Sequence, residues 1–270
     1  MAALLRLVHP APAAAVVSLS AVLAAILSQQ VASTPFSDRV FLVTLSVLGS
    51  QIVTGAMNDW ADRERDAITQ PAKPIPAGRV SPSTALGLAG VGLVLQVAAS
   101  VPLGATALIL GLLAVGSAIS YDLWLSRTAA SFVPYLVSFG ILPLWIAAGV
   151  GVPLERVALA SVLVGPFAVA AHLANTLKDF DGDAAMGSGN LAQRMGRTRA
   201  SVLAVTLALG VGLGAGGGLG IGGRIGLPSL VLGVVGLVAV AQGIGGARRL
   251  WAGMLVAAVS WTAAWALATG

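Results

Sequence analysis

The sequence predicts an all-α integral membrane protein with about nine transmembrane helices. Hydrophobic residues make up 57% of the 270 residues and charged residues only 9%, whereas soluble domains are about a quarter charged. Apolar runs of about 20 residues, the length that crosses a bilayer as a helix, recur along the chain. The runs do not alternate apolar with polar residues as barrel strands do, so helices are the way to satisfy their backbone groups in lipid.

The expected spans are read from these runs in chain order. They lie near residues 11–30, 38–57, 83–101, 104–121, 129–150, 157–177, 200–219, 227–245 and 250–268. The first run follows Arg6 and could be a signal peptide, but its length and the lack of a polar mature domain favour a retained span. Ser81 and Pro82 predict the start of the third span, as a helix cap followed by proline at the first helical position.

Charge distribution predicts the orientation of the chain. The net charge is +5, and nine spans with a cytoplasmic N-terminus place twelve of the fifteen Lys and Arg residues on the cytoplasmic side. We therefore expect a prokaryotic plasma-membrane protein whose basic residues report topology, with no nucleic-acid partner. The chain has no cysteine, which excludes disulfides, thiolate catalysis and cysteine-based metal sites.

Two acidic stretches with the same spacing follow the second and the sixth span. Both MNDWADRERD, residues 57–66, and ANTLKDFDGD, residues 174–183, contain the pattern N-x3-D-x3-D. Together they hold seven of the ten carboxylates in the chain. The six residues of the two patterns are Asn58, Asp62, Asp66, Asn175, Asp179 and Asp183.

The placement of these patterns predicts a shared site. On a continuous helix, positions four apart lie on one face, so each stretch should present a column of one Asn and two Asp. An even number of spans separates the columns, so both should lie on the same side of the membrane. The spacing, repeated with AGR and MGR downstream, indicates two pseudo-repeat halves, about 1–125 and 126–245, plus a last helix at 250–268, within a single domain covering 1–270.

The chemistry of the columns predicts bound Mg²⁺. Several carboxylates around one cavity need counter-ions, and Mg²⁺ takes oxygen ligands while bridging to phosphate. Asp59, Glu64 and Asp181 fall off the columns and are expected to be solvated or to support the ligands, although Asp59 and Asp181 remain possible ligands. The alternative is that all these acids are solvated charges at helix ends. The expected metal ligands are Asn58, Asp62, Asp66, Asp179 and Asp183.

Basic residues in the loops after the two stretches predict a site for diphosphate. Lys73 and Arg79 lie in the proline-rich loop AITQPAKPIPAGRVSPS, and Lys178 lies within the second stretch. Cations beside carboxylate-bound metal neutralise the remaining phosphate charge. For Lys73 the alternative is an anchor at the cytoplasmic membrane surface.

These motifs resemble those of the UbiA superfamily of intramembrane prenyltransferases. Its signature N-D-x-x-D-x-x-x-D is matched from Asn58 to Asp66, and its second signature, D-x-x-x-D, by Asp179 and Asp183. KPIPAGRVSP is similar to the family loop RPIPSGRIS, and DGDAAMGSGNLAQRMG to EGDxxxGxxTLAVRLG. The span pattern covers about residues 5–268, with specific motifs at 55–82 and 172–199.

The resemblance implies a ring of nine helices around a central cavity, with cap loops on the cytoplasmic side. It implies Mg²⁺-dependent loss of diphosphate from an isoprenyl diphosphate and transfer of the isoprenyl group to a lipid-soluble or aromatic acceptor. The implied catalytic residues are Asn58, Asp62, Asp66, Asp179, Asp183 and Tyr121. The implied diphosphate ligands are Lys73, Arg79, Lys178, Arg127 and Asn175.

The chain departs from the family pattern after the fourth span and in the second loop. Leu125 stands where members often have lysine, and Arg127 is the candidate substitute. Tyr121 remains, as a stabiliser of the cation or as an interfacial anchor. Asn190 replaces the usual threonine. Neither departure removes a metal-binding carboxylate, so the chemistry is expected to be kept and the identity of the acceptor is what the departures affect.

Two other functions share some of these features. A terpene cyclase would keep both acidic motifs and need no acceptor. A transporter of cations or phosphorylated lipids would need ionisable groups near mid-membrane, whereas the acids here gather at one side. Chain length of the isoprenyl group, oligomeric state and the role of His172 stay open, and His9 is expected at the membrane interface.

Overall fold

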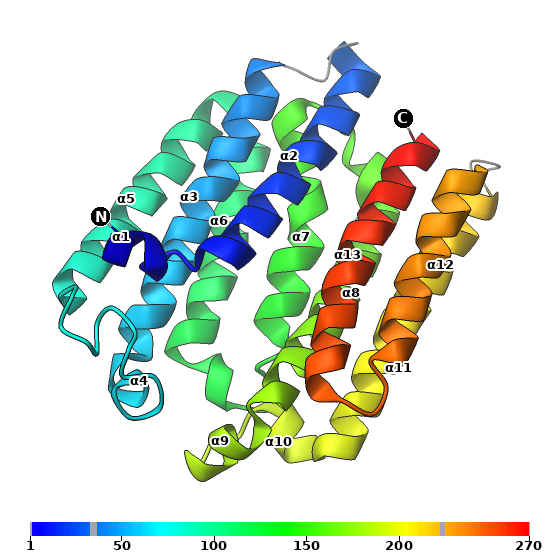
Figure 1. Cartoon of the computed structure of the whole chain (residues 1–270). Helices are drawn as coiled ribbons and strands as arrows, with labels where there is room; N and C mark the ends of the chain where they lie inside the picture. Colours follow the sequence, from blue (N-terminus) through cyan, green and yellow to red (C-terminus); the bar gives the residue numbers. More distant parts are fainter. Residues whose placement is uncertain (1, 33–36, 222–224, 270) are drawn as a thin grey trace. The chain divides into compact units, whose positions relative to one another are not determined.

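The structure is a computed structural model that describes residues 2–32, 37–221 and 225–269. Every regular element within these ranges is a helix (Figure 1). The α-helices are α1 (Ala2–Leu7), α2 (Pro10–Ala32), α3 (Asp38–Ala61), α4 (Arg63–Thr69), α5 (Pro82–Ser100), α6 (Ala105–Leu123), α7 (Val133–Val150), α8 (Ala158–Lys178), α9 (Phe180–Ala185), α10 (Leu191–Met195), α11 (Arg197–Ile221), α12 (Leu227–Gln242) and α13 (Ala247–Thr269). Three short 3₁₀ turns, η1 (Val101–Leu103), η2 (Leu125–Arg127) and η3 (Leu154–Val157), join them.

The apolar runs fold into helices of membrane-spanning length, as expected. Eight helical segments among the described residues are long and apolar enough to cross a bilayer. The apolar run expected at 227–245 forms α12, which has 16 residues and is shorter than the others. The predicted fold class, an all-α integral membrane protein, is confirmed.

The chain divides into two compact units. The first comprises Met1–Trp124 and Leu144–Leu154, and the second Leu125–Pro143 and Glu155–Gly270. In the first unit α3 packs against α5, α2 and α6; in the second, α8 packs against α11 and α13, and α12 packs against α13. The helices α3 and α8, in which the two acidic motifs begin, are thus each packed within their own unit.

Small residues bring α3 close to α5, as can be followed in Figure 1. A Cβ added to Gly49 of α3 would lie 2.6 Å from the backbone nitrogen of Gln96 in α5, so only glycine allows this approach. The hydroxyls of Ser46 and Ser100 are hydrogen-bonded across the same interface at 2.6 Å. Close small-residue contacts and hydroxyl bonds are the usual means of packing helices in lipid, and here they fix the helix that ends at the first motif.

Arg39 fixes the N-terminal end of α3. Its Nε donates to the Gly149 carbonyl at 2.8 Å, and its Nη2 donates to the Leu103 carbonyl at 3.0 Å. Both acceptors lie at helix ends, where carbonyls lack partners inside the helix and a cation is favoured. The helix that carries the first motif is therefore held at its N-terminal end and along its first half.

Candidate functional site

The helix that carries the first motif does not continue through it. Helix α3 ends at Ala61 and α4 begins at Arg63, with Asp62 between them at φ −89° and ψ 3°. The backbone hydrogen bonds Asp62 N to Asn58 O and Asp66 N to Asp62 O persist at 2.9 and 2.8 Å. The expected column on one continuous helix is therefore wrong, since the chain leaves helical geometry at Asp62.

The second motif breaks at the equivalent residue. Helix α8 ends at Lys178 and α9 begins at Phe180, with Asp179 between them at φ −105° and ψ 15°. The Asp179 N–H bonds to Thr176 O at 3.2 Å, which tightens the last turn. Both middle aspartates thus occupy the sparsely populated region between helix and strand, where many active-site residues are found.

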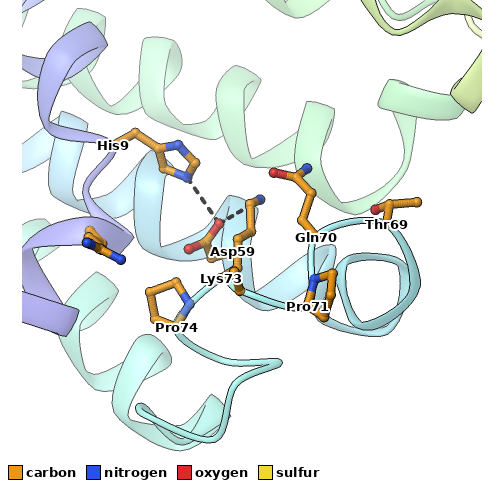
Figure 2. Close-up of a pocket in the computed structure, with 9 residues that line it drawn as sticks. His9, Asp59, Thr69, Gln70, Pro71, Lys73 and Pro74 are labelled. Atoms are coloured by element: carbon orange, nitrogen blue, oxygen red, sulfur yellow. Dashed lines mark hydrogen bonds and ion pairs between the residues drawn. The ribbon is translucent and has the colours of Figure 1, made fainter.

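Two carboxylates of the first motif share one lysine. Lys73 Nζ lies 3.0 Å from Asp59 Oδ1 and 2.7 Å from Asp66 Oδ2, and both carboxylate side chains are 3% exposed. His9 Nε2 lies 3.1 Å from the same Asp59 oxygen, and Figure 2 shows both contacts converging on Asp59. Asp59 is therefore buried, so the solvated role is wrong, and the supporting and ligand roles remain predictions.

The cluster of Asp59, Asp66 and Lys73 contains two carboxylates and one ammonium. Burial raises the pKa of Asp66, with repulsion from Asp62 and Asp59 adding to it, and the hydrogen bond from Lys73 only partly offsets the effect. Burial alone lowers the pKa of Lys73, but bonding to Asp66 and attraction to Asp59 outweigh it, so that pKa is raised. One ammonium neutralises less negative charge than the site holds, which favours an additional cation or proton.

Lys73 is positioned by a compact proline-rich loop. The Lys73 N–H bonds to Gln70 O at 2.9 Å, and the Ala77 N–H bonds to Lys73 O at 3.0 Å. Arg79, expected to bind diphosphate, is exposed and donates its Nη2 to the Ala72 carbonyl. In this structure Arg79 holds the loop that carries Lys73.

Asn58 makes a contact that the sequence did not indicate. Its Nδ2 donates to Asp122 Oδ1 at 3.0 Å, across 64 residues of chain. Asp122 lies at the end of α6, beside Tyr121. The bond orients the amide by holding its nitrogen on this carboxylate.

A hollow of about 560 Å³ opens beside the Asp59–Lys73 pair. Residues of the N-terminal segment and of the loop after α4 both line it, and Figure 2 shows these residues. Its lining residues are Arg6, His9, Asp59, Thr69, Gln70, Pro71, Ala72, Lys73 and Pro74. Two side chains that carry a positive charge at neutral pH, Arg6 and Lys73, and one carboxylate face this space, which suits an anionic group.

The last aspartate of the second motif is held by a neutral partner. Asp183 is 6% exposed, and Asn190 Nδ2 donates to its Oδ2 at 3.0 Å. Asn190 Oδ1 also accepts from the Gln193 N–H at 3.0 Å, which caps α10. Asparagine in place of the family's threonine thus supplies an acceptor and a donor on separate atoms.

The other predicted site residues of the second unit lie as follows. Asp179 is exposed, and Lys178 Nζ lies 4.5 Å from the centre of the Trp251 ring, a cation–π contact. Arg127 is exposed, and its carbonyl accepts from the Gly189 N–H at 3.0 Å. Asn175 is half-buried near the end of α8. The structure therefore places Lys178 on an aromatic ring, and a diphosphate would have to draw it away.

His172 is packed inside the second unit. It is 2% exposed, its Nε2 lies 3.2 Å from Ser131 Oγ, and its ring stacks on Tyr135 at 4.2 Å. Ser131 Oγ also accepts from the Leu191 N–H at 3.2 Å. His172 therefore helps to join α8 to the segment before α7 and to the start of α10.

The predicted ligands suit Mg²⁺ by the type of their oxygen atoms, and the structure does not gather them into one cluster among the described residues. Within the part of the chain that the structure describes, no three His, Cys, Asp or Glu side chains form a group that could hold a metal ion. The predicted ligand set is thus not a ready-made cluster there. Mg²⁺ commonly takes one or two carboxylates and completes its shell with water and phosphate oxygens, and the negative surplus around Asp66 fits that mode of binding.

Three residues in or beside the first motif make contacts that the sequence did not reveal. The bond from His9 to Asp59 was not expected, Asp59 was placed off the column and kept only as a possible ligand, and Asp122 was not considered. A signal was available for two of them. Asp59 and Asp122 are acids at the ends of apolar runs, where a buried carboxylate needs a partner.

Comparison with known proteins agrees with the motifs. The model of the UbiA prenyltransferase family matches residues 16–251. The digeranylgeranylglyceryl phosphate synthase of Korarchaeum cryptofilum is 30% identical over 181 residues, covering 64% of this chain and 62% of that protein. The bacteriochlorophyll synthase 33 kDa chain of Rhodobacter capsulatus is 29% identical over 180 residues, covering 60% and 57%. This chain therefore spans less than two thirds of the length of these relatives.

Solved structures show the same fold at low sequence identity. A UbiA homologue from Aeropyrum pernix K1, without ligand, matches with a TM-score of 0.75 and 17% identity, covering 91% of this chain and 95% of that one. A UbiA homologue from Archaeoglobus fulgidus bound to GPP and Mg²⁺ matches with a TM-score of 0.67 and 15% identity, covering 99% and 100%. With the family match extending over most of its length, this chain belongs to the UbiA prenyltransferase family.

Proposed function

We propose that this protein transfers an isoprenyl group from an isoprenyl diphosphate to a lipid-soluble or aromatic acceptor, releasing diphosphate at the cytoplasmic side of the membrane in a Mg²⁺-dependent reaction. The observation that carries the proposal is the lysine shared by two buried carboxylates, Asp59 and Asp66, beside an open hollow. The names of its relatives, and the GPP and Mg²⁺ bound to a homologue of the same fold, support it.

Each motif would supply oxygen ligands for the metal. In the first these are Asn58, whose amide is oriented by Asp122, together with Asp62 and Asp66; in the second they are Asp179 and Asp183. Bound Mg²⁺ would supply neutralisation of the charge that develops on the leaving diphosphate.

The remaining steps fall to side chains of the chain itself. Lys73 would turn from its carboxylates to the diphosphate oxygens, with Arg79, Arg127, Lys178 and Asn175 as further candidate ligands. Tyr121 would face the allylic cation through its aromatic ring. The apolar helices would shelter the isoprenyl tail and exclude water from the cation.

The test is an assay of the purified protein in detergent. We expect diphosphate release from isoprenyl diphosphates of different length only with Mg²⁺ and only when an acceptor is added, and we expect EDTA to abolish it. The acceptor panel should include phosphorylated glycerol lipids and aromatic acids. Release without any acceptor would indicate a cyclase or hydrolase instead, and no release under any condition would contradict the proposed function.

A further inference from the structure

The N-terminal segment, residues 2–9, packs together with the loop that carries Lys73. The Leu7 side chain is fully buried in a cluster with Ile75, Val80 and Ala85. Ile75 and Val80 belong to the loop between α4 and α5, and Ala85 to the first turn of α5. The segment is therefore part of the wall of the first motif, whereas a peripheral anchor would leave Leu7 exposed.

The backbone of this segment is held in a conformation that needs its surroundings. A Cβ on Gly55 of α3 would lie 2.6 Å from the Leu7 carbonyl oxygen, so glycine is required for the segment to lie against the helix. His9 has φ 51°, in the left-handed region that side chains rarely adopt. Such strain persists where the surrounding contacts over-determine the position, and it is often found at functional sites.

The strained residue points its ring at a carboxylate of the motif. His9 Nε2 donates to Asp59 Oδ1 at 3.1 Å, and Lys73 Nζ approaches the same oxygen at 3.0 Å. Asp59 therefore has two partners on one atom, from two different segments (Figure 2).

The two partners have different freedom to move. In the proposed function Lys73 binds the diphosphate, which draws it from Asp59. A buried carboxylate that loses its partner is strongly destabilised. His9 does not lie in the loop with Lys73, and its bond can persist when Lys73 turns away.

We propose that His9 is a positioning residue that holds the Asp59 carboxylate when Lys73 leaves it for a diphosphate anion, so that the N-terminal segment belongs to the substrate-binding machinery. This inference rests on the proposed function. Without His9, Lys73 would be the remaining cation on that Asp59 oxygen. Moving Lys73 to a diphosphate would then leave the buried carboxylate without that bond, which makes diphosphate binding less favourable.

The test measures binding, by calorimetry, of inorganic pyrophosphate and of an unreactive thio analogue of geranyl diphosphate, each with Mg²⁺, to the detergent-solubilised full chain. His9→Ala should weaken both affinities about tenfold, the effect of losing one hydrogen bond to a charged group. His9→Gln, whose amide can still donate to Asp59, should recover most of the loss. In an Asp59→Asn background His9→Ala should change nothing further, because no charge is left stranded.

The controls separate this role from simple support of the fold. Leu7→Ala loosens the packing of the segment and keeps the imidazole; it should lower the unfolding temperature more than it lowers the affinity. Glu64→Gln removes an exposed charge from the same region and should leave binding unchanged.

Each remaining outcome decides the matter. A Gln variant as weak as Ala, or an equal loss from His9→Ala with and without the Asp59 charge, would overturn the role of His9 while leaving the proposed function intact. If Asp59→Asn abolishes binding, the comparison of Gln with Ala decides alone. If the unaltered protein binds neither probe, the proposed function fails, and the inference fails with it.

Discussion

The last aspartates of the two motifs are both buried, and each accepts a hydrogen bond from a different kind of side chain. Asp66 is 2% exposed and Asp183 is 6% exposed. Each is bonded by the side chain seven positions further along the chain, but Asp66 by the ammonium of Lys73 at 2.7 Å and Asp183 by the amide of Asn190 at 3.0 Å. The same local geometry therefore accommodates a charged donor in one unit and a neutral donor in the other.

This difference assigns different tasks to the two regions. The first motif carries its own cation, and its loop is fastened by the N-terminal segment. The second uses its partner, Asn190, to cap α10 as well. We expect removal of the Lys73 charge to lower the stability of the first region. In the second region, removal of Asn190 should lower stability by about as much as the loss of a helix cap does.

The largest effect is expected from the two middle aspartates, where the regions should behave alike. Asp62→Ala and Asp179→Ala should each lower turnover by at least about 100-fold, since each removes a proposed carboxylate ligand of the Mg²⁺ that would neutralise the leaving diphosphate. Both variants should remain folded and membrane-inserted by detergent gel filtration. Glu64→Gln and Asp181→Asn, whose side chains are 87% and 90% exposed, are matched controls that should stay within twofold. A fully active Asp62→Ala enzyme would contradict the metal-site interpretation.

Lys73→Met should reveal the charge difference in stability. It leaves two buried carboxylates without their shared cation, for which we expect a loss of about 3 kcal/mol in the free energy of unfolding. Binding of pyrophosphate should weaken as well. Urea unfolding in detergent measures the first effect and calorimetry the second, with Lys73→Arg as the variant that keeps the charge. Unchanged pyrophosphate affinity would remove Lys73 from the diphosphate site.

Asn190→Ala, the matching change in the second unit, should cost less. It removes a helix cap and one hydrogen bond to a carboxylate, for which we expect about 2 kcal/mol. Asn190→Thr restores the residue usual in the family, keeps a capping oxygen and should lose less than half of that. A loss larger than that of Lys73→Met, in the same unfolding assay, would reverse the order inferred from the structure.

The smallest effect concerns pH. The pKa of Asp66 is raised in the folded protein above 3.8, so folding favours its protonated form. The contribution of Asp66 to stability is then present in full below pH 3.8 and is lost as pH rises through the folded-state value. Asp66→Asn should remove this part of the pH dependence, visible as a difference between the two proteins' unfolding curves from pH 3.5 upward, roughly over two pH units. Parallel curves would mean that Lys73 fully compensates the carboxylate.

The sequence located the two motifs but did not predict that each is divided between two helices. The four-residue spacing of Asn58, Asp62 and Asp66 correctly marked a recurring helical hydrogen-bond pattern. It could not show that the helix would break at Asp62, because the spacing of residues is the same on one continuous helix and on two helices joined at a single residue. Arg79 has the composition of an anion ligand, yet it donates to its own loop, a choice that depends on the folded shape of the loop.

Local chemistry was enough to determine that the chain forms apolar helices, that acids and basic loops follow two of them, and that Ser81 starts α5. Helix formation, span length and capping depend on neighbours within a few residues, so they can be read along the chain. The pairing of charges was decided by tertiary structure. His9 meets Asp59 across 50 residues because Gly55 lets the N-terminal segment lie against α3. Asn58 meets Asp122 across 64 residues because α6 packs against α3. A buried charge must be paired, but which residue pairs with it depends on which helices pack together.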